Sequence, residues 1–175
     1  MFKREDYVIK IVDPNRRKVR AYVNSIATKN QLSHKLMFPK ALRDRCGCAA
    51  ILLSLQTKKI AGIAGMTLPE SGHDNNPVLL FIWADKEVPR MQRELLIALF
   101  CHSRQQYGAY PDVAEFLELC YKIEDRRLDL IAFRETAILG IASANAKRLT
   151  LNSPGVSVFV ACEARLRQAK AQSVG

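Results

Sequence analysis

The sequence predicts an α+β protein, with a β-rich amino-terminal domain over residues 1–67 followed by a mainly helical domain over residues 78–175. Short alternating and apolar runs between turn residues are typical of strands, and they fill the first part. Apolar residues at helical spacing dominate the second part. Between them, LPESGHDNNP at 68–77 is rich in Gly, Pro and Asn, which favours a linker.

The first elements are expected to be strands. Residues 7–24, YVIKIVDPNRRKVRAYVN, contain two alternating runs around an Asp-Pro-Asn turn, and this pattern predicts a β-hairpin. On its second run, Lys18 and Arg20 fall on one face of the expected strand. The next two segments, 25–30 and 33–38, also predict short strands.

A short helix is expected after these strands. Residues 39–45, PKALRDR, begin with Pro39, which suits the first turn of a helix because no intrahelical partner awaits its missing N–H. Gly47 suits a left-handed residue at the helix end. Two further runs, AAILLSLQ at 49–56 and IAGIAGM at 60–66, surround Thr-Lys-Lys and predict a tight hairpin.

The second part of the chain has a different pattern of apolar residues. VLLFIWAD at 78–85 predicts a buried strand, while 88–108 and 110–127 carry apolar residues along one helical face. Residues 128–144 are compatible with a helix or a strand, and 156–170 predict a closing helix. Such apolar stripes are typical of packing surfaces. We therefore interpret 78–175 as a dimerisation or effector domain.

The charge of the chain is concentrated near its amino terminus. Residues 1–60 contain 14 Lys and Arg against 4 Asp and Glu, whereas residues 61–175 contain 13 of each. The whole net charge of +10 therefore belongs to the first third of the chain. Such asymmetry favours a polyanionic partner for that region.

Residues 22–66 resemble the swapped-hairpin DNA-binding domain of the AbrB-type regulators. The resemblance lies in the order SIATKN, SHKLMF before Pro39, the basic helical turn KALRDRCG, and the closing hairpin. The chain has His34-Lys35 where family members usually have Gly-Arg, and Asp44 at a position where Arg is common. The resemblance implies that two chains interlock their hairpins into one small barrel.

The resemblance and the charge pattern together predict a bacterial or plasmid-type transcriptional regulator that binds double-stranded DNA in a sequence-specific way as a homodimer. By position, the resemblance implies DNA contacts from Lys29, Lys35 and Arg43. Local charge adds Lys40 and Arg45, and the face of the first hairpin extends the basic surface. The candidate DNA-binding residues are Lys18, Arg20, Lys29, Lys35, Lys40, Arg43 and Arg45.

Two alternatives stay open at this point. Residues 78–123 loosely resemble the ribbon-helix-helix regulators, although their strand carries few polar side chains to read bases. The chain also fits an antitoxin or assembly component whose basic region docks on an acidic protein partner. No G-x-S-x-G, Walker-type or H-E-x-x-H motif is present, so neither an enzyme nor a cofactor is expected.

Cysteine usage and hydropathy predict a cytoplasmic protein. The five cysteines form no C-x-x-C pair and the three histidines are scattered, so we expect reduced, mostly buried thiols and no metal site. The longest apolar runs fall far short of the ~20 residues that a bilayer crossing requires. The first residues, MFKREDYVIK, lack the apolar segment of a secretory signal.

Overall fold

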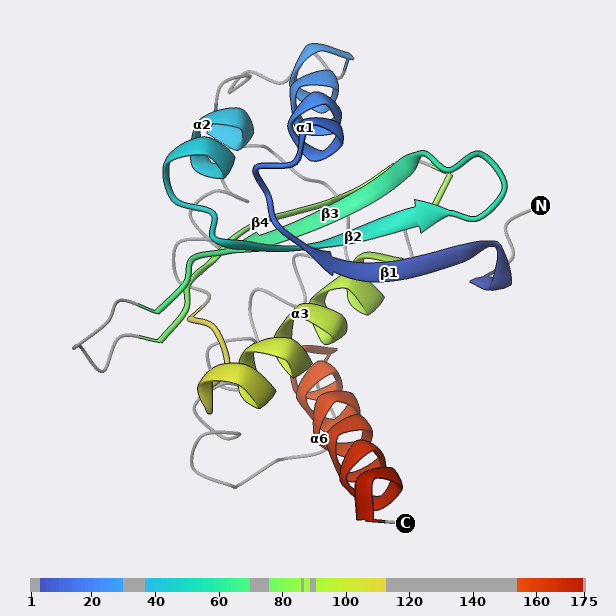
Figure 1. The fold of residues 1–175 in the computed structure, drawn as a ribbon, viewed down its shortest axis with the longest axis vertical. Helices are drawn as coiled ribbons and strands as arrows, with labels where there is room; N and C mark the ends of the chain where they lie inside the picture. Colours follow the sequence, from blue (N-terminus) through green and yellow to red (C-terminus); the bar gives the residue numbers. More distant parts are fainter. Residues whose placement is uncertain are drawn as a thin grey trace.

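A four-stranded antiparallel sheet with helices on both faces forms the centre of the protein (Figure 1). The computed structural model describes residues 4–29, 37–69, 76–85, 87–88, 91–112 and 154–174. The strands are β1 (Tyr7–Val12), β2 (Cys48–Ser54), β3 (Ile60–Met66) and β4 (Leu79–Ala84). The helices are η1 (Arg4–Asp6), α1 (Arg17–Lys29), α2 (Met37–Asp44), α3 (Met91–Tyr107) and α6 (Pro154–Val174). These elements confirm the α+β fold class.

The sheet order β1-β2-β3-β4 follows the sequence, and each strand is antiparallel to the next. After α3, the chain returns beside β4 in the parallel direction, through a bridge between Val78 and Asp112. The Leu79 amide donates to the Asp112 carbonyl at 2.8 Å, and the Asp112 amide donates to the Pro77 carbonyl at 2.8 Å. The β4–α3 unit is therefore the start of a crossover of the kind that joins parallel strands.

Both faces of the sheet are buried. Helices α1 and α2 cover one face, while α3 covers the other and carries α6 on its far side (Figure 1). Along β2, Leu52 belongs to the cluster beneath α3, whereas Ile51 belongs to the cluster beneath α1 and α2. A strand with two buried faces requires apolar residues at nearly every position, which accounts for the sequence CAAILLS.

The predicted hairpin over 7–24 is wrong in its second half, and the strand predicted over 25–30 is also wrong. The first run forms β1, and Asp-Pro-Asn forms a turn, but that turn leads into helix α1. Val19, Val23 and Ile26 are all buried on the inner face of α1. Because positions four apart share a face in both a helix and a strand, the alternation of this segment did not distinguish the two.

The short basic helix is confirmed, but it begins earlier than expected. Met37 and Phe38, predicted as the end of a strand, form the start of α2, and Pro39 lies in its first turn. Gly47 is not left-handed: a Cβ on this residue would lie 2.3 Å from Cγ of Leu68, so close packing explains the glycine. Residues 30–36, and with them most of the strand predicted over 33–38, lie outside the described residues.

The hairpin over 49–66, the strand over 78–85 and the helices over 88–108 and 156–170 are confirmed as β2–β3, β4, α3 and α6. Residues 113–153 lie outside the described part of the chain, so the elements expected at 110–127 and 128–144 remain predictions. Strand β4 pairs with β3 across the segment 68–77. The described residues on the two sides of the predicted domain boundary thus share one sheet.

This arrangement changes what the two family resemblances can explain. An interlocked hairpin needs a strand where α1 lies, so the described residues do not form that topology. A ribbon-helix-helix protein needs a strand that pairs with a second copy, whereas β4 is hydrogen-bonded to β3 within one chain and five of its six residues are buried. Neither topology therefore accounts for the observed sheet.

Candidate functional site: a hollow beside a basic helical layer

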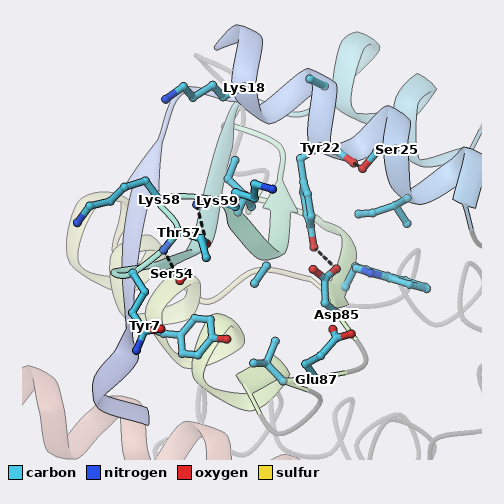
Figure 2. A pocket seen from close by; sticks show the side chains of 17 residues that line it. Tyr7, Lys18, Tyr22, Ser25, Ser54, Thr57, Lys58, Lys59, Asp85 and Glu87 are labelled. Carbon is cyan, nitrogen blue, oxygen red and sulfur yellow. Dashed lines mark hydrogen bonds between the residues drawn. The ribbon is translucent and has the colours of Figure 1, made fainter. Parts of the chain in front are cut away.

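A hollow of about 940 Å³ opens between α1, the turn that joins β2 to β3, and the carboxyl end of β4 (Figure 2). It lies at the end of the sheet where β2 and β4 end and β1 and β3 begin. The hollow has the size of a small-molecule site. Its lining combines lysines, carboxylates and aromatic side chains.

The basic side of the hollow is built by the β2–β3 turn and the first turn of α1. Lys58 and Lys59 project from the turn, and Lys18 comes from α1 (Figure 2). The Thr57 amide donates to Ser54 Oγ at 3.2 Å, and the Lys58 amide donates to the Ser54 carbonyl at 3.0 Å. These hydrogen bonds hold the turn, and with it the two lysines, at a defined place on the rim.

The turn contains the one non-glycine residue with a positive φ among the residues that the structure describes. Lys58 has a φ of 57°, a left-handed conformation that side chains with a Cβ rarely adopt. Glycine would fit this position with less strain. The lysine is therefore present at some cost in backbone energy, which draws attention to its side chain.

The acidic side of the hollow lies where β4 ends. The Tyr22 hydroxyl of α1 donates to Oδ1 of Asp85 at 2.8 Å, and Glu87 lies nearby (Figure 2). The Asp85 amide donates to the Ala61 carbonyl at 2.8 Å, which ties the end of β4 to the start of β3. Burial, and then the negative charge of Asp85, raise the pKa of Tyr22 well above its usual value. Tyr22 therefore remains a hydrogen-bond donor at every physiological pH.

Most of the predicted DNA-binding residues lie outside this hollow, on α1, on α2 or directly after α2. Lys18, Arg20, Lys40, Arg43 and Arg45 are all solvent-exposed, and only Lys18 also lines the hollow. Lys29 is the last residue of α1, with its side chain outside the described set, and Lys35 lies in the segment that the structure does not describe.

Helices α1 and α2 contact each other on one face of the sheet. We call residues 16–29 and 37–45 the basic helical layer: they contain eight Lys and Arg and a single acid, Asp44. That acid is engaged by its neighbour, because Arg43 Nε donates to Asp44 Oδ1 at 2.8 Å. The hydrogen bond and the charge of Arg43 lower the pKa of Asp44. The pair is fully exposed, so the interaction is weak.

Except for Lys18, the residues that line the hollow were not predicted as site residues from the sequence. Lys58 and Lys59 stood in the expected hairpin turn, and Asp85 stood at the end of an expected strand, but nothing in their local pattern linked them. Tyr22 was placed on a strand rather than on a helix. The one available signal was the pair of adjacent lysines, Lys58 and Lys59, in the turn of a predicted buried hairpin. That turn lies at this end of the sheet.

The described cysteines are unpaired by disulfides, and they differ in environment. Burial raises the pKa of Cys46 to about 12 and that of Cys48 to about 11. Between α3 and α6, the thiol of the half-buried Cys101 donates to the Cys162 carbonyl at 3.7 Å, and the Cys162 thiol donates to the Ile97 carbonyl at 3.6 Å. The interaction of the two neighbouring thiols lowers the pKa of Cys101 and raises that of the buried Cys162. Cys120 lies outside the described residues.

No protein-family model, curated protein or solved structure matches the chain. Across the described ranges, the His, Cys, Asp and Glu side chains form no group of three or more placed to hold a metal ion. Over the same residues, no helix combines the length and apolar character needed to span a membrane.

Proposed function

We propose that the protein binds double-stranded DNA through the basic helical layer. One observation carries the proposal: two helices on the same face of the sheet, with the residues that directly flank them, hold eight Lys and Arg and one acid. Phosphates repeat along both strands of a duplex, so a broad cationic surface gains affinity from several of them at once. Five of the seven cations expected to contact DNA are exposed on this layer.

The side chains suit phosphate recognition. Arg20 and Arg43 present planar guanidinium groups, which contact a phosphate or a guanine edge with two parallel hydrogen bonds. Lys40 acts more as a point charge. Asp44 engages Arg43 only through a fully exposed contact, so a phosphate competes with it at little cost.

The proposal rests on charge and exposure rather than on the swapped-hairpin resemblance, because helices and not strands carry the cations. A homodimer, a cytoplasmic location and a role as a sequence-specific transcriptional regulator remain predictions of the sequence. Selection from a random duplex library tests them, since a dimer with two-fold symmetry recovers a palindromic site. The proposal assigns no catalytic activity.

The direct test compares two variants that each remove two positive charges. Lys40→Ala/Arg43→Ala changes the basic helical layer, whereas Arg167→Ala/Lys170→Ala changes exposed cations on α6. Fluorescence anisotropy with a labelled duplex, over a salt series, measures the affinity of each. We expect the first variant to bind more weakly and its log–log salt slope to fall by about 1 for each phosphate contact removed.

The unfolding temperature of both variants should equal that of the wild type, since all four side chains are exposed. Equal losses of affinity in the two variants would show that overall charge, and not this layer, drives binding. No duplex binding by the wild type at low salt would favour the alternative that the same layer docks on an acidic protein partner.

A further inference from the structure

We propose that the hollow between α1, the β2–β3 turn and the end of β4 binds a nucleoside phosphate. This site goes beyond the DNA-binding surface: α1 contributes residues to both, but Lys18 is the only candidate DNA-binding cation that lines the hollow. At about 940 Å³, the hollow matches the upper range of small-molecule sites, which suits a ligand of nucleotide size.

The two ends of the hollow carry opposite charges, and this limits what it can hold. Lys58 and Lys59 stand on the turn at one side, and Asp85 and Glu87 occupy the other; Figure 2 shows the Lys59 side chain extending toward Tyr22 and that of Lys58 extending away from it. A simple anion would be repelled by the carboxylates, and a simple cation would be repelled by the lysines. The complementary ligand is therefore anionic at one end and rich in hydrogen-bond donors at the other.

The lysine side fits the phosphates. The Ser54–Lys59 turn is held by its own hydrogen bonds, including the Ser54 amide to the Lys59 carbonyl at 2.9 Å. These hydrogen bonds fix the backbone of the turn, so only the lysine side chains lose freedom when a phosphate binds. The left-handed backbone at Lys58, where glycine is the easier residue, is consistent with selection for its ammonium group.

The opposite side fits the nucleoside. Asp85 and Glu87 are acceptors for ribose hydroxyls or for an exocyclic amino group of the base. The Tyr22 hydroxyl, which donates to Asp85, orients that carboxylate. Tyr7, Tyr22 and Trp83 also line the hollow, and aromatic side chains stack on nucleobases. Phosphate, ribose and base thus each have a matching group.

The experiment is isothermal titration calorimetry of the full chain with ADP, GDP, CDP and UDP. Inorganic pyrophosphate and the corresponding nucleosides serve as matched probes that lack one half of the ligand. We expect at least one nucleoside diphosphate to bind with one-to-one stoichiometry. Its nucleoside and pyrophosphate should each bind at least tenfold more weakly, because each engages only one end of the hollow.

Variants then locate the site. Lys59→Ala and Asp85→Asn should each weaken nucleotide binding at least tenfold, while Lys10→Ala, an exposed lysine on β1, should leave it unchanged. Glu87→Gln provides a second acidic-side variant that does not disturb the Tyr22 hydrogen bond, in case Asp85→Asn fails to fold. Duplex binding by Lys59→Ala, measured in parallel, should stay at the wild-type value.

The proposal is overturned if no diphosphate binds at millimolar concentration. It is equally overturned if pyrophosphate binds as tightly as the nucleotide, or if binding survives both Lys59→Ala and Glu87→Gln. Loss of duplex binding with nucleotide binding intact would instead contradict the proposed function alone, so the two failures are distinguishable.

Discussion

The two faces of the sheet are covered in different ways. On one face, the single long helix α3 contacts all four strands and buries Leu95, Leu99 and Phe100 completely. On the other face, α1 and α2 are shorter, and they leave a hollow beside the β2–β3 turn. Tight cover on one side gives the sheet a rigid base from which the other side can present charged groups.

The charged side chains also differ between the two faces of the sheet. The α3–α6 pair joins its charged groups across the helices, as when Arg165 Nη2 donates to Glu94 Oε2 at 2.8 Å. In the basic helical layer, eight cations share one acid. A surface with so few acidic residues among its cations is suited to an external polyanion. The comparison teaches that one face serves stability and the other serves binding.

Thiol reactivity should show the largest contrast. The pKa of Cys46 is about 12, whereas that of Cys101 is lowered from its usual value. The thiolate is the reactive form, so at pH 7.5 Cys101 should carry more thiolate than Cys46 and should be alkylated faster. As the pH is raised, the alkylation rate of Cys101 should level off at a lower pH than that of Cys46. Iodoacetamide labelling followed by peptide mass spectrometry measures both rates, and equal rates would contradict the assigned environments.

Core truncation on the two faces tests the difference in cover. Leu95→Ala on α3 removes a fully buried side chain against the sheet and should cost about 2–5 kcal/mol of unfolding free energy. Leu42→Ala on the short α2 should cost less, because a helix with fewer contacts can settle into the space. Urea denaturation compares the two variants. A larger cost for Leu42→Ala would reverse the assignment of the more rigid face.

Substitutions at two glycines distinguish the stability cost of steric crowding from the cost of backbone strain. A Cβ at Gly65 would lie 2.5 Å from Cζ of Phe81 and 2.9 Å from Sγ of Cys46, so Gly65→Ala should cost about 1–3 kcal/mol. Gly108, just after α3, has a φ of +78° with open space around it. Gly108→Ala should therefore cost only about 1 kcal/mol, from backbone strain. Thermal unfolding provides the comparison, and a neutral Gly65→Ala would contradict the close packing of β3 against β4.

The smallest effect on stability is expected at the rim of the hollow. Lys58→Gly relieves a left-handed backbone that costs about 1–2 kcal/mol, partly offset by the greater flexibility of unfolded glycine. The unfolding midpoint should therefore rise slightly while affinity for a nucleoside diphosphate falls. Calorimetry and thermal unfolding of the same sample test both outcomes. A clear loss of stability would show that the Lys58 side chain supports the fold rather than a ligand.

Local signals explain which elements the sequence predicts well. The β2–β3 hairpin, β4, α3 and α6 each carry a pattern within their own residues: paired apolar runs around Thr-Lys-Lys, a buried run after a linker, or apolar residues at helical spacing. Helix α1 was missed because Val19 and Val23 lie four positions apart, a spacing that strands and helices share. The partner of β1 turned out to be β2, about 40 residues away, which a local pattern does not specify.

The sequence by itself determined the α+β class, the buried hairpin and the concentration of positive charge in the first 60 residues, because composition and periodicity are properties of neighbouring residues. Only the tertiary structure determines which acidic side chains lie close to those positive charges. Lys59 and Asp85 line one hollow because β3 pairs with β4 and the Asp85 amide is bonded to Ala61. Strand pairing over a distance depends on the free energy of the whole sheet and its two buried faces, and no short stretch of sequence contains that information.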